Sequence, residues 1–255
     1  MSKSLFDLSG KVALVTGSTR GIGKSMAEEL ARAGCKIVVS SRKADACDAT
    51  RVEFEKQGFE VLAQPCNVSR KEELKALVDA TVARWGRIDI AIANAAVNPY
   101  YGPLTEIPDE AIDKVFHNNV KSVLWLAALT LPGMAARGGG SFITVGSIGG
   151  IIANTVIGAY GISKAADHHL VRNLAAEWGP KNVRVNAIAP GLIKTDFAKA
   201  LWEDEKRREG RIAVTPLRRL GEPRDIGGIA VFLASEAAAF ITGQAIVADG
   251  GVTIL

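Results

Sequence analysis

The chain has 255 residues, of which 48% are hydrophobic and 23% charged, so it can bury a sizeable core in one or two domains. This composition excludes an intrinsically disordered chain, and a formal net charge of +4 without a long basic run argues against nucleic-acid binding. The three cysteines and three histidines complete no metal-ligand spacing, so we expect no metal site and a reducing compartment.

Short apolar runs alternate with helix-like segments along the whole chain. The patterns predict strands over residues 11–16, 36–40, 60–64, 88–95, 141–147, 183–190 and 244–251. They predict helices over 21–34, 70–86, 109–136 and about 158–179, with further helical stretches before Gly58 and before the last strand. Apolar runs without alternation are typical of strands buried on both faces of a parallel sheet. We therefore expect an α/β fold of the Rossmann type, a doubly wound seven-stranded parallel sheet in three α/β/α layers, formed by a single domain over residues 1–255.

The stretch TGSTRGIG, residues 16–23, follows the first predicted strand and opens the first helix. At such a junction the free amides and the positive dipole end of the helix bind phosphate, and glycines let the backbone approach. The glycine spacing differs from G-x-G-x-x-G, and a plain tight turn is the alternative. Because this is the first strand–helix junction, we expect a dinucleotide pyrophosphate here, bound by Gly17, Ser18, Thr19, Arg20, Gly21, Ile22 and Gly23.

We expect the residues that discriminate NAD from NADP to lie at the end of the second predicted strand. In NAD sites an acidic residue about 20 positions after the glycines binds the ribose hydroxyls. Here that position holds Ser41, followed by Arg42, so no carboxylate repels a 2′-phosphate and a guanidinium can bind it. Arg20 adds positive charge, although both arginines could simply be exposed. We expect NADP(H), with NAD(H) as the alternative.

Tyr160 and Lys164 stand four residues apart in YGISK and would share one face of a helix. The pKa of tyrosine is normally about 10, so acid/base work near pH 7 requires its anion to be stabilised by roughly 4 kcal/mol. The Lys164 ammonium would supply much of that, and its length would let it bind a ribose hydroxyl. Ser147 ends a predicted strand and could donate to a substrate carbonyl or only to local backbone. This set indicates hydride transfer with a tyrosine acid/base.

Asn118 and Asn119 lie inside an otherwise apolar helical segment. Buried amides need hydrogen-bond partners. One interpretation is that an asparagine here bonds to a neighbouring strand. The other is that it binds the water of a proton relay that leads from Lys164.

Taken together, these residues resemble the short-chain dehydrogenase/reductase family almost end to end. TGSTRGIG resembles the family's cofactor loop, ANAA its Asn-Asn-Ala-Gly segment, NNVKS its catalytic asparagine segment and PGLIKT its Pro-Gly segment. The resemblance implies a catalytic set of Asn119, Ser147, Tyr160 and Lys164. Tyr160 would be the general acid/base and Ser147 would polarise the substrate oxygen. Lys164 would lower the tyrosine pKa and bind the ribose, and Asn119 would hold the relay water.

The same resemblance implies further cofactor contacts. Beside Tyr160 and Lys164, they would come from Asn67, Val68, Asn94, Ala95, Pro190, Gly191, Ile193 and Thr195. Asn94 would support the central strand, the backbone of Ile193 would meet the carboxamide, and Thr195 would lie near the pyrophosphate. Two residues depart from the family pattern, because Asn67 replaces an aspartate that contacts adenine and Ala96 replaces a glycine. An amide oxygen can still accept from the adenine amino group.

The substrate pocket should lie beside Ser147 and Tyr160. Its expected walls are Val97, Tyr100, Tyr101, Ile148, Val156, Leu192, Phe197 and Trp202, although several of these could only fill the core. No arginine anchor for a carboxylate stands among them, which favours a ketone, aldehyde or secondary alcohol with an apolar body. NAAVNPYYGPL and APGLIKTDFAKALW are most similar to the NADP-dependent carbonyl reductases of retinal and dicarbonyl compounds within the family.

An NADPH-dependent carbonyl reductase is therefore the leading hypothesis. The nearest rival is a 3-oxoacyl-thioester reductase, for which Lys194, Lys199 and Arg207 could form a basic patch at the pocket mouth. A rival of another class is a non-catalytic nucleotide-sensing module, which the presence of both Tyr160 and Lys164 disfavours.

The family resemblance also implies a homo-oligomer, with a tetramer expected, that packs through the helices over 109–136 and 158–179. Small residues in the second helix would permit close packing. We expect a cofactor-binding part of about 1–140 and a substrate loop of about 192–215, whose charged stretch is either a solvated helix or a lid. No signal peptide or membrane-spanning run is visible, and the chain ends in TIL rather than in a peroxisomal tripeptide, so we expect a cytoplasmic protein.

Overall fold

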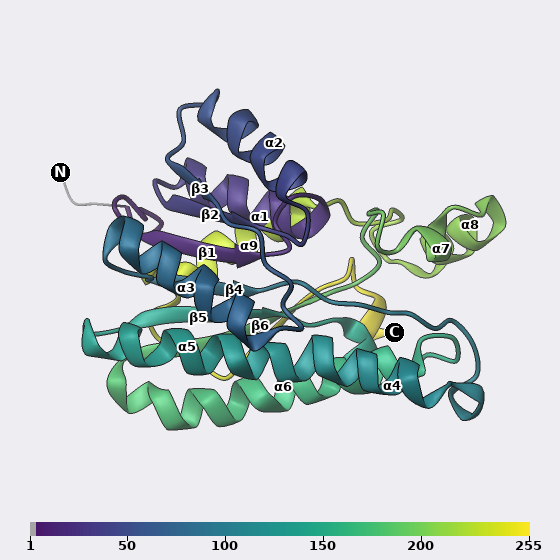
Figure 1. Ribbon diagram of the computed structural model, residues 1–255. Coiled ribbons are helices and arrows are strands. Elements are labelled where there is room, and N and C mark those ends of the chain that lie inside the picture. The colour runs from purple at the N-terminus through teal and green to yellow at the C-terminus, as the bar shows by residue number, and fades with distance from the viewer. Residues whose placement is uncertain (1–3) are drawn as a thin grey trace.

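The computed structural model describes residues 4–255, and these residues form a seven-stranded sheet with helices on both faces (Figure 1). The strands are β1 (Val12–Thr16), β2 (Lys36–Ser40), β3 (Val61–Ala63), β4 (Ile90–Ala93), β5 (Gly140–Val145), β6 (Val183–Pro190) and β7 (Ala245–Ala248). Every pairing is parallel and the strand order is β3-β2-β1-β4-β5-β6-β7. The predicted Rossmann-type fold and its seven parallel strands are confirmed; the first three residues of the predicted domain lie outside the described part.

Helices cover both faces of the sheet and complete the three layers. One face carries α1 (Gly21–Arg32), α2 (Ala44–Glu55) and α9 (Arg224–Ala234). The other carries α3 (Lys71–Trp85), α4 (Asp109–Phe116), α5 (Ser122–Ala136) and α6 (Gly158–Trp178). Two short helices, α7 (Lys199–Trp202) and α8 (Glu205–Val214), project from one end (Figure 1). Short 3-10 turns occupy Leu104–Glu106, Ile148–Gly150, Gly179–Lys181, Glu236–Ala238 and Val252–Ile254.

The sheet separates two apolar clusters, which explains the unbroken apolar runs of its strands. Successive side chains of a strand point to opposite faces, so a strand covered on both sides is mostly apolar on both. Exceptions such as Ser141 and Asn186 are buried with hydrogen bonds to backbone carbonyls. Ile143 and Val145 of β5 pack with α1 and α9, whereas Phe142 packs with α3, α5 and α6. Both clusters are almost completely shielded from solvent.

The segment over 109–136 departs from the single helix that the sequence predicts. A π-helical turn, His117–Lys121, separates α4 from α5. Asn119 in this turn is fully buried, and its side chain bonds to both the amide and the carbonyl of Val97 in the loop after β4. This tertiary contact accommodates the extra residue, and such turns are frequent at functional sites.

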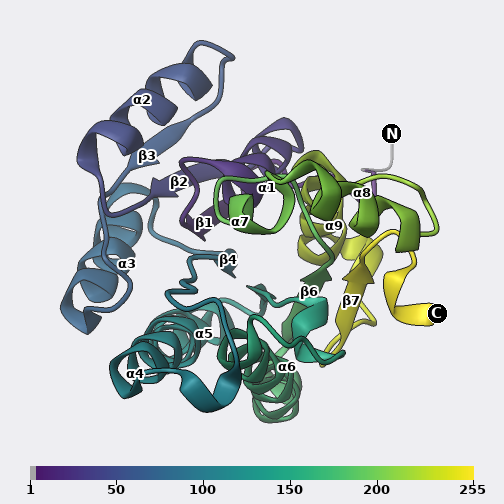
Figure 2. The same cartoon turned by 90° about the vertical axis from the view of Figure 1, so that its right-hand side faces the viewer.

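The carboxyl ends of the parallel strands all meet at one edge of the sheet (Figure 2). The order reverses at β1, because the chain passes from β1 to β2 and β3 on one side and then returns to β4 on the other. In open α/β sheets, ligands bind outside the strand ends at this point. Within residues 4–255, no helix is long and apolar enough to cross a membrane.

Candidate active site

A cavity of about 600 Å³ opens at the carboxyl edge of the sheet. Loops that follow β1, β2, β4, β5 and β6 contribute to its lining. Its lining includes the glycine-rich turn after β1 and the side chains of Ser147, Tyr160 and Lys164. The structure thus brings the predicted phosphate end and the predicted chemical end into one space.

The glycine-rich turn leaves room for a phosphate at the start of α1. Gly21, the first residue of the helix, has a φ of +56°, which favours glycine over other residues. A Cβ atom on Gly23 would lie 2.3 Å from the carbonyl oxygen of Gly17, so any side chain there would fill the turn. Arg20 precedes the helix without a capping side-chain bond. Free amides and the helix dipole therefore face the cavity, and this donor set fits the pyrophosphate of a dinucleotide.

Two predicted cofactor residues support this turn from below. Ser18 is completely buried; its hydroxyl donates to the carbonyl of Val15 at 2.7 Å and accepts from the amide of Ser40 at 2.9 Å. Asn94 lines the cavity, and its amide donates to the carbonyl of Thr16 at 2.8 Å and to that of Gly17 at 3.1 Å. Both side chains tie neighbouring strands to the turn and fix its shape.

Exposed basic residues surround the end of β2. Arg42 and Lys43 line the cavity, and neither side chain has an ion-pair partner among the residues that the structure describes. Lys43 was not predicted, although its place directly after Arg42 could have indicated it. Arg20 lies across the cavity mouth from Asp196, with a side-chain N–O distance of 3.3 Å. The region therefore offers two unpaired cations to an anionic group.

Asn67 lines the adenine end of the predicted site, but its side-chain oxygen is used locally. This oxygen accepts from the amide of Ser69 at 3.2 Å and from the hydroxyl of Ser69 at 2.9 Å. The amide of Asn67 donates to the Glu73 carboxylate at 2.7 Å. These bonds hold the turn before α3, and Val68 lines the cavity beside Asn67.

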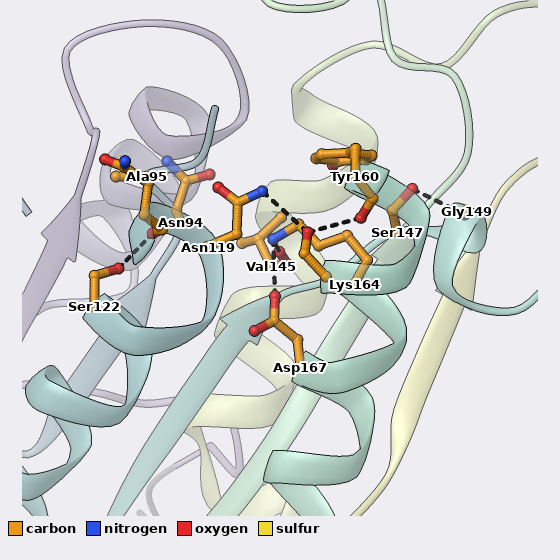
Figure 3. Close-up of polar contacts among 12 residues, drawn as sticks. Asn94, Ala95, Asn119, Ser122, Val145, Ser147, Gly149, Tyr160, Lys164 and Asp167 are labelled. Carbon is orange, nitrogen blue, oxygen red and sulfur yellow. Dashed lines mark hydrogen bonds and ion pairs between the residues drawn. The ribbon is translucent and has the colours of Figure 1, made fainter. Parts of the chain in front are cut away.

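At the chemical end, Ser147 follows β5 and Tyr160 and Lys164 lie in the first two turns of α6 (Figure 3). The Ser147 hydroxyl accepts a bond of 3.0 Å from the amide of Gly149, which leaves its own hydrogen free to donate. The Tyr160 ring lies 5.9 Å from the ring of Phe197, between centroids. The Lys164 ammonium lies 5.7 Å from the centroid of the Tyr160 ring.

Lys164 is almost completely buried and is held by two acceptors. Its ammonium donates to the carbonyl of Val145 at 2.8 Å and to the carboxylate of Asp167 at 2.9 Å (Figure 3). Burial lowers the pKa of Lys164, but the Asp167 carboxylate and the Tyr160 phenol raise it, and the net direction is upward. Lys164 is therefore held as a cation.

Burial is the largest influence on Tyr160, and it raises the pKa of the phenol. The Lys164 ammonium lowers that pKa, and so does the Ser147 hydroxyl, for which the sequence predicts only a role at the substrate oxygen. The Asp167 carboxylate and the Tyr101 phenol act in the other direction, and the net pKa lies above the ordinary value. Sequence reasoning missed Asp167, whose signal is a carboxylate three residues after the lysine on the same helical face.

Asn119 has its amide fully occupied. Its nitrogen donates to the carbonyl of Val97 at 3.0 Å and to the hydroxyl of Ser163 at 3.1 Å, and its oxygen accepts from the amide of Val97 at 2.8 Å. Ser163 in turn donates to the carbonyl of Tyr160 at 2.7 Å. Asn119 therefore links the loop after β4 to α6 through its side chain and does not line the cavity itself.

The end of β6 and the loop that follows it form one wall of the cavity. Pro190, Gly191, Ile193 and Thr195 all line it. Thr195 lies close to the glycine turn, because a Cβ atom on Gly21 would lie 3.2 Å from its methyl carbon. Its carbonyl accepts from the indole of Trp202 at 3.0 Å.

The predicted substrate walls divide into two groups. Val97, Tyr101, Ile148, Leu192 and Phe197 line the cavity, whereas Tyr100, Val156 and Trp202 do not. The Tyr100 hydroxyl donates to the carbonyl of Pro103, and Trp202 bonds to Thr195. Other residues also line the cavity; Leu201 and Arg211 come from the predicted loop of about 192–215, whereas the sequence did not indicate Asn98, Ile152, Asn154, Ile157 and Val252.

Comparisons with known proteins agree with this arrangement. A family model described as Enoyl-(Acyl carrier protein) reductase matches residues 17–253. The chain is 43% identical over 244 residues to Dehydrogenase/reductase SDR family member 4 of Sus scrofa, which covers 96% of this chain and 88% of the relative. It is 39% identical over 245 residues to 7alpha-hydroxysteroid dehydrogenase of Escherichia coli K12, which covers 96% and 94%.

Solved structures are similar over nearly the whole chain. A 7alpha-hydroxysteroid dehydrogenase complexed with NADH and 7-oxo glycochenodeoxycholic acid aligns with a TM-score of 0.94 at 38% identity and covers 98% of both chains. A gluconate 5-dehydrogenase from Burkholderia cenocepacia J2315, in complex with NADP and tartrate, aligns with a TM-score of 0.94 at 32% identity, again over 98% of both chains. One of these structures holds NADH and the other NADP.

Proposed function

This chain belongs to the short-chain dehydrogenase/reductase family of nicotinamide-dependent oxidoreductases, and we propose that it is an NADP(H)-dependent carbonyl reductase. It would interconvert a ketone or aldehyde with the corresponding alcohol. The observation that carries the proposal is the shared cavity, in which Ser147, Tyr160 and Lys164 face the same space as the glycine turn. An acid/base group thus lies within reach of a ligand whose pyrophosphate is bound at α1.

In the reductive direction, the substrate oxygen would accept hydrogen bonds from Ser147 and Tyr160. When bound along the residues from the glycine turn to Lys164, the nicotinamide cofactor would supply the hydride for the carbonyl carbon. As the C=O bond becomes C–O⁻, the Tyr160 O–H bond breaks and its proton passes to that oxygen, which gives the alcohol and leaves Tyr160 as a phenolate. The Lys164 ammonium stabilises this phenolate, and Ser147 keeps the substrate oxygen oriented.

The preference for NADP(H) is part of the proposal. Arg42 and Lys43 line the cavity, and neither has an ion-pair partner in the part of the chain that the structure describes. Ser41 occupies the position at which NAD-binding sites have a carboxylate, which would repel a 2′-phosphate. The Ser41 hydroxyl donates to the carbonyl of Lys43, which orders this loop. Arg20 contributes less freely because it pairs with Asp196.

We propose a substrate with an apolar body. Val97, Ile148, Leu192 and Phe197 give the cavity apolar walls beside Tyr160. A relative named for a hydroxysteroid and a solved structure with a 7-oxo bile acid are consistent with such a ligand. Residues of about 192–215 would form the substrate loop, and residues 1–140 would bind most of the cofactor.

The 3-oxoacyl-thioester alternative has less support. Of its predicted basic patch, Lys199 pairs with Glu203, Arg207 bonds to the carbonyl of Ala200, and Lys194 lies over the ring of Trp202. None of these three lines the cavity. Arg211 does, so it is the residue on which a phosphate of such a substrate would depend.

The family resemblance also underlies a proposed homotetramer that packs through α4, α5 and α6. Leu124 of α5 and Ile162 of α6 support it, because both side chains are about half exposed in the single chain. Of the small residues of α6, Ala165 and Ala166 are accessible and would permit close packing, whereas Ala159 is buried within the chain. The cytoplasmic location stays a prediction.

The test is turnover of the reduced nicotinamide, followed by its absorbance, with NADPH and NADH in separate assays. The carbonyl panel contains diketones, aryl ketones, retinal, a 7-oxo bile acid and an acetoacetyl thioester. We expect turnover with NADPH on an apolar ketone, at least about 100-fold lower in Tyr160→Phe because the proton donor is lost. Tyr100→Phe is the matched control, since the Tyr100 side chain lies outside the cavity lining, and it should keep its activity.

Three other outcomes would change the proposal. Equal or greater efficiency with NADH would overturn the cofactor preference. Full activity in Tyr160→Phe would overturn the tyrosine mechanism. Tight NADPH binding without turnover on any carbonyl of the panel would favour the nucleotide-sensing module.

A further inference from the structure

A buried carboxylate lies directly behind Lys164. Asp167 belongs to α6 and its side chain has no exposure to solvent. Its Oδ2 atom lies 2.9 Å from the Lys164 ammonium (Figure 3). Burial of a carboxylate costs free energy unless the charge is paired, so a completely buried aspartate needs a specific reason.

Lys164 is the one side-chain partner that Asp167 has among the described residues. The second carboxylate oxygen, Oδ1, is buried and has no hydrogen-bond partner there. An aspartate that capped a helix or tied two strands together would accept from a backbone amide, as Asp204 does at the start of α8, whereas no such bond involves Asp167 among the described residues. The contacts of Asp167 therefore point to the lysine rather than to the fold.

The pairing limits what Lys164 can do. An ammonium has three N–H groups, and Lys164 directs one at the carbonyl of Val145 and one at Asp167. A single N–H remains for a ligand in the cavity or for the phenolate of Tyr160. The ammonium is thus oriented before any ligand binds.

The pairing also changes the charge that Tyr160 experiences. The Lys164 ammonium favours the phenolate, whereas the Asp167 carboxylate behind it opposes the phenolate. The other groups that face this cluster are Ser147 after β5 and Tyr101 after β4, and the pKa of His168, the next residue on α6, is lowered by burial. Near Tyr160 and Lys164, Asp167 is therefore the negative charge that opposes the lysine.

We propose that Asp167 is a positioning residue, which fixes the Lys164 ammonium by a buried ion pair and sets the proton release of Tyr160 to higher pH than the lysine alone would give. The proposal rests on the roles of Tyr160 and Lys164 in the function proposed above. The effect on Tyr160 follows from the opposite charges of Lys164 and Asp167. Removal of a negative charge makes the loss of a proton from the coupled Tyr160–Lys164 pair easier, and the phenol is the group whose release drives alcohol oxidation.

The first experiment needs no substrate. In a background of Tyr100→Phe and Tyr101→Phe, Tyr160 is the remaining tyrosine of three, and its ionisation can be followed by the ultraviolet absorbance of tyrosinate with saturating NADP⁺. We expect Asp167→Asn, which keeps the shape and removes the charge, to lower the titration midpoint by about one pH unit. Asp167→Ser, a second neutral variant, should lower it in the same direction.

Glu177→Gln is the matched control, because it removes a carboxylate from the exposed far end of α6. Its midpoint should equal that of the parent protein. Thermal unfolding of each variant shows whether α6 is still folded. A neutral variant that loses folding altogether, in both the Asn and Ser forms, would overturn the inference, because Asp167 would then serve the fold.

A second readout uses activity. The pH at which NADP⁺-dependent alcohol oxidation reaches half its maximum should fall with the spectroscopic midpoint in Asp167→Asn. An unchanged or higher midpoint would overturn the inference even if carbonyl turnover is normal. A lower tyrosinate midpoint in a protein that turns over no carbonyl would instead support the inference for Tyr160 while the carbonyl reductase proposal fails.

Discussion

Single residues at the cavity are held in place by the protein itself. The amide of Gly149 bonds to the Ser147 hydroxyl at 3.0 Å, and the carbonyl of Val145 accepts from Lys164 at 2.8 Å. Donors that are oriented in advance need no reorganisation when charge develops on a substrate. Side chains at the other end are less constrained, because Arg42 and Lys43 are exposed and without ion-pair partners in residues 4–255.

The exposed side chain of Arg42 leads to a prediction about the preference between NADPH and NADH. Arg42→Asp should lower kcat/KM for NADPH by roughly 10- to 150-fold, because a hydrogen bond to a charged group contributes about 1.5–3 kcal/mol. The efficiency with NADH should fall much less, since NADH carries no 2′-phosphate. Steady-state kinetics with both cofactors measure the ratio. Lys56→Asp, at an exposed position after α2, is the control and should leave the ratio unchanged. An equal loss with both cofactors would contradict the role of Arg42.

The sequence predicts single residues well where their type is tied to one backbone conformation or one spacing. Gly21 and Gly23 lie in the predicted turn, and Tyr160 and Lys164 share a face of α6 as expected. Asp167 could not be recognised in the same way, because the burial of a carboxylate depends on which helix face the sheet covers. Tyr100 was predicted as a wall of the substrate pocket, but its hydroxyl donates to the carbonyl of Pro103. The spacing of residues in the sequence does not indicate which way this side chain points.

At the scale of elements, the strands follow from composition and the helix interruption follows from packing. Every predicted strand is present, and the ends differ by a few residues; β4, for example, covers Ile90–Ala93 within the predicted 88–95. The π-helical turn His117–Lys121 could not be predicted, because Asn119 is held there by a contact with Val97, which comes from another part of the chain. Periodicity records the face of a helix, but not a single inserted residue.

The ion pair between Arg219 and Asp225, at the start of α9, leads to a prediction about stability and pH. The Arg219 guanidinium bonds to both oxygens of Asp225 at 2.6 and 2.9 Å and holds the pKa of Asp225 at about 2, below its ordinary 3.8. Because this folded-state pKa is depressed, the stabilisation is present above about pH 4 and disappears as the pH falls towards 2. Asp225→Asn should lower the free energy of unfolding at pH 7 by about 1 kcal/mol, a figure reduced for solvent screening.

Urea denaturation of wild type and Asp225→Asn at pH 7 and at pH 3 measures this effect. The difference between the two proteins should shrink at the lower pH. Asp79→Asn, which breaks an exposed pair with Lys75 on α3, is the control and should cost only about 0.3–0.5 kcal/mol. A difference that is the same at both pH values would show that the charge of Asp225 is not the source of the stability.

At the scale of the whole molecule, the alternation of strands and helices made the architecture predictable. Strands without an alternation of polar and apolar residues need cover on both faces, and parallel pairing needs a crossover between strands, so helices are expected between the strands. The surface through which several copies would assemble cannot be predicted in this way. Apolar residues such as Leu124 on α5 and Val82 on α3 are exposed to a similar degree, so their exposure does not show which helix forms the contact. The family resemblance, rather than the pattern, predicts the interface on α4, α5 and α6.

Sedimentation velocity tests this assignment. The wild-type protein should sediment as a tetramer, and Leu124→Glu should form smaller species because a charge would be buried at the contact. Val82→Glu places the same charge at an equally exposed position on α3 and should leave the tetramer intact. A monomeric wild type, or equal effects of the two substitutions, would contradict the proposed interface.

The strand order β3-β2-β1-β4-β5-β6-β7 affects how the sheet can form while the ribosome synthesises the chain. β2 pairs with β1, β3 with β2 and β4 with β1, and each later strand pairs with the one before it. Every strand after β1 therefore finds one neighbour already synthesised when it emerges. Each strand except the edge strands β3 and β7 keeps at least one side open until a later strand covers it, so the sheet can grow outward from β1 during translation.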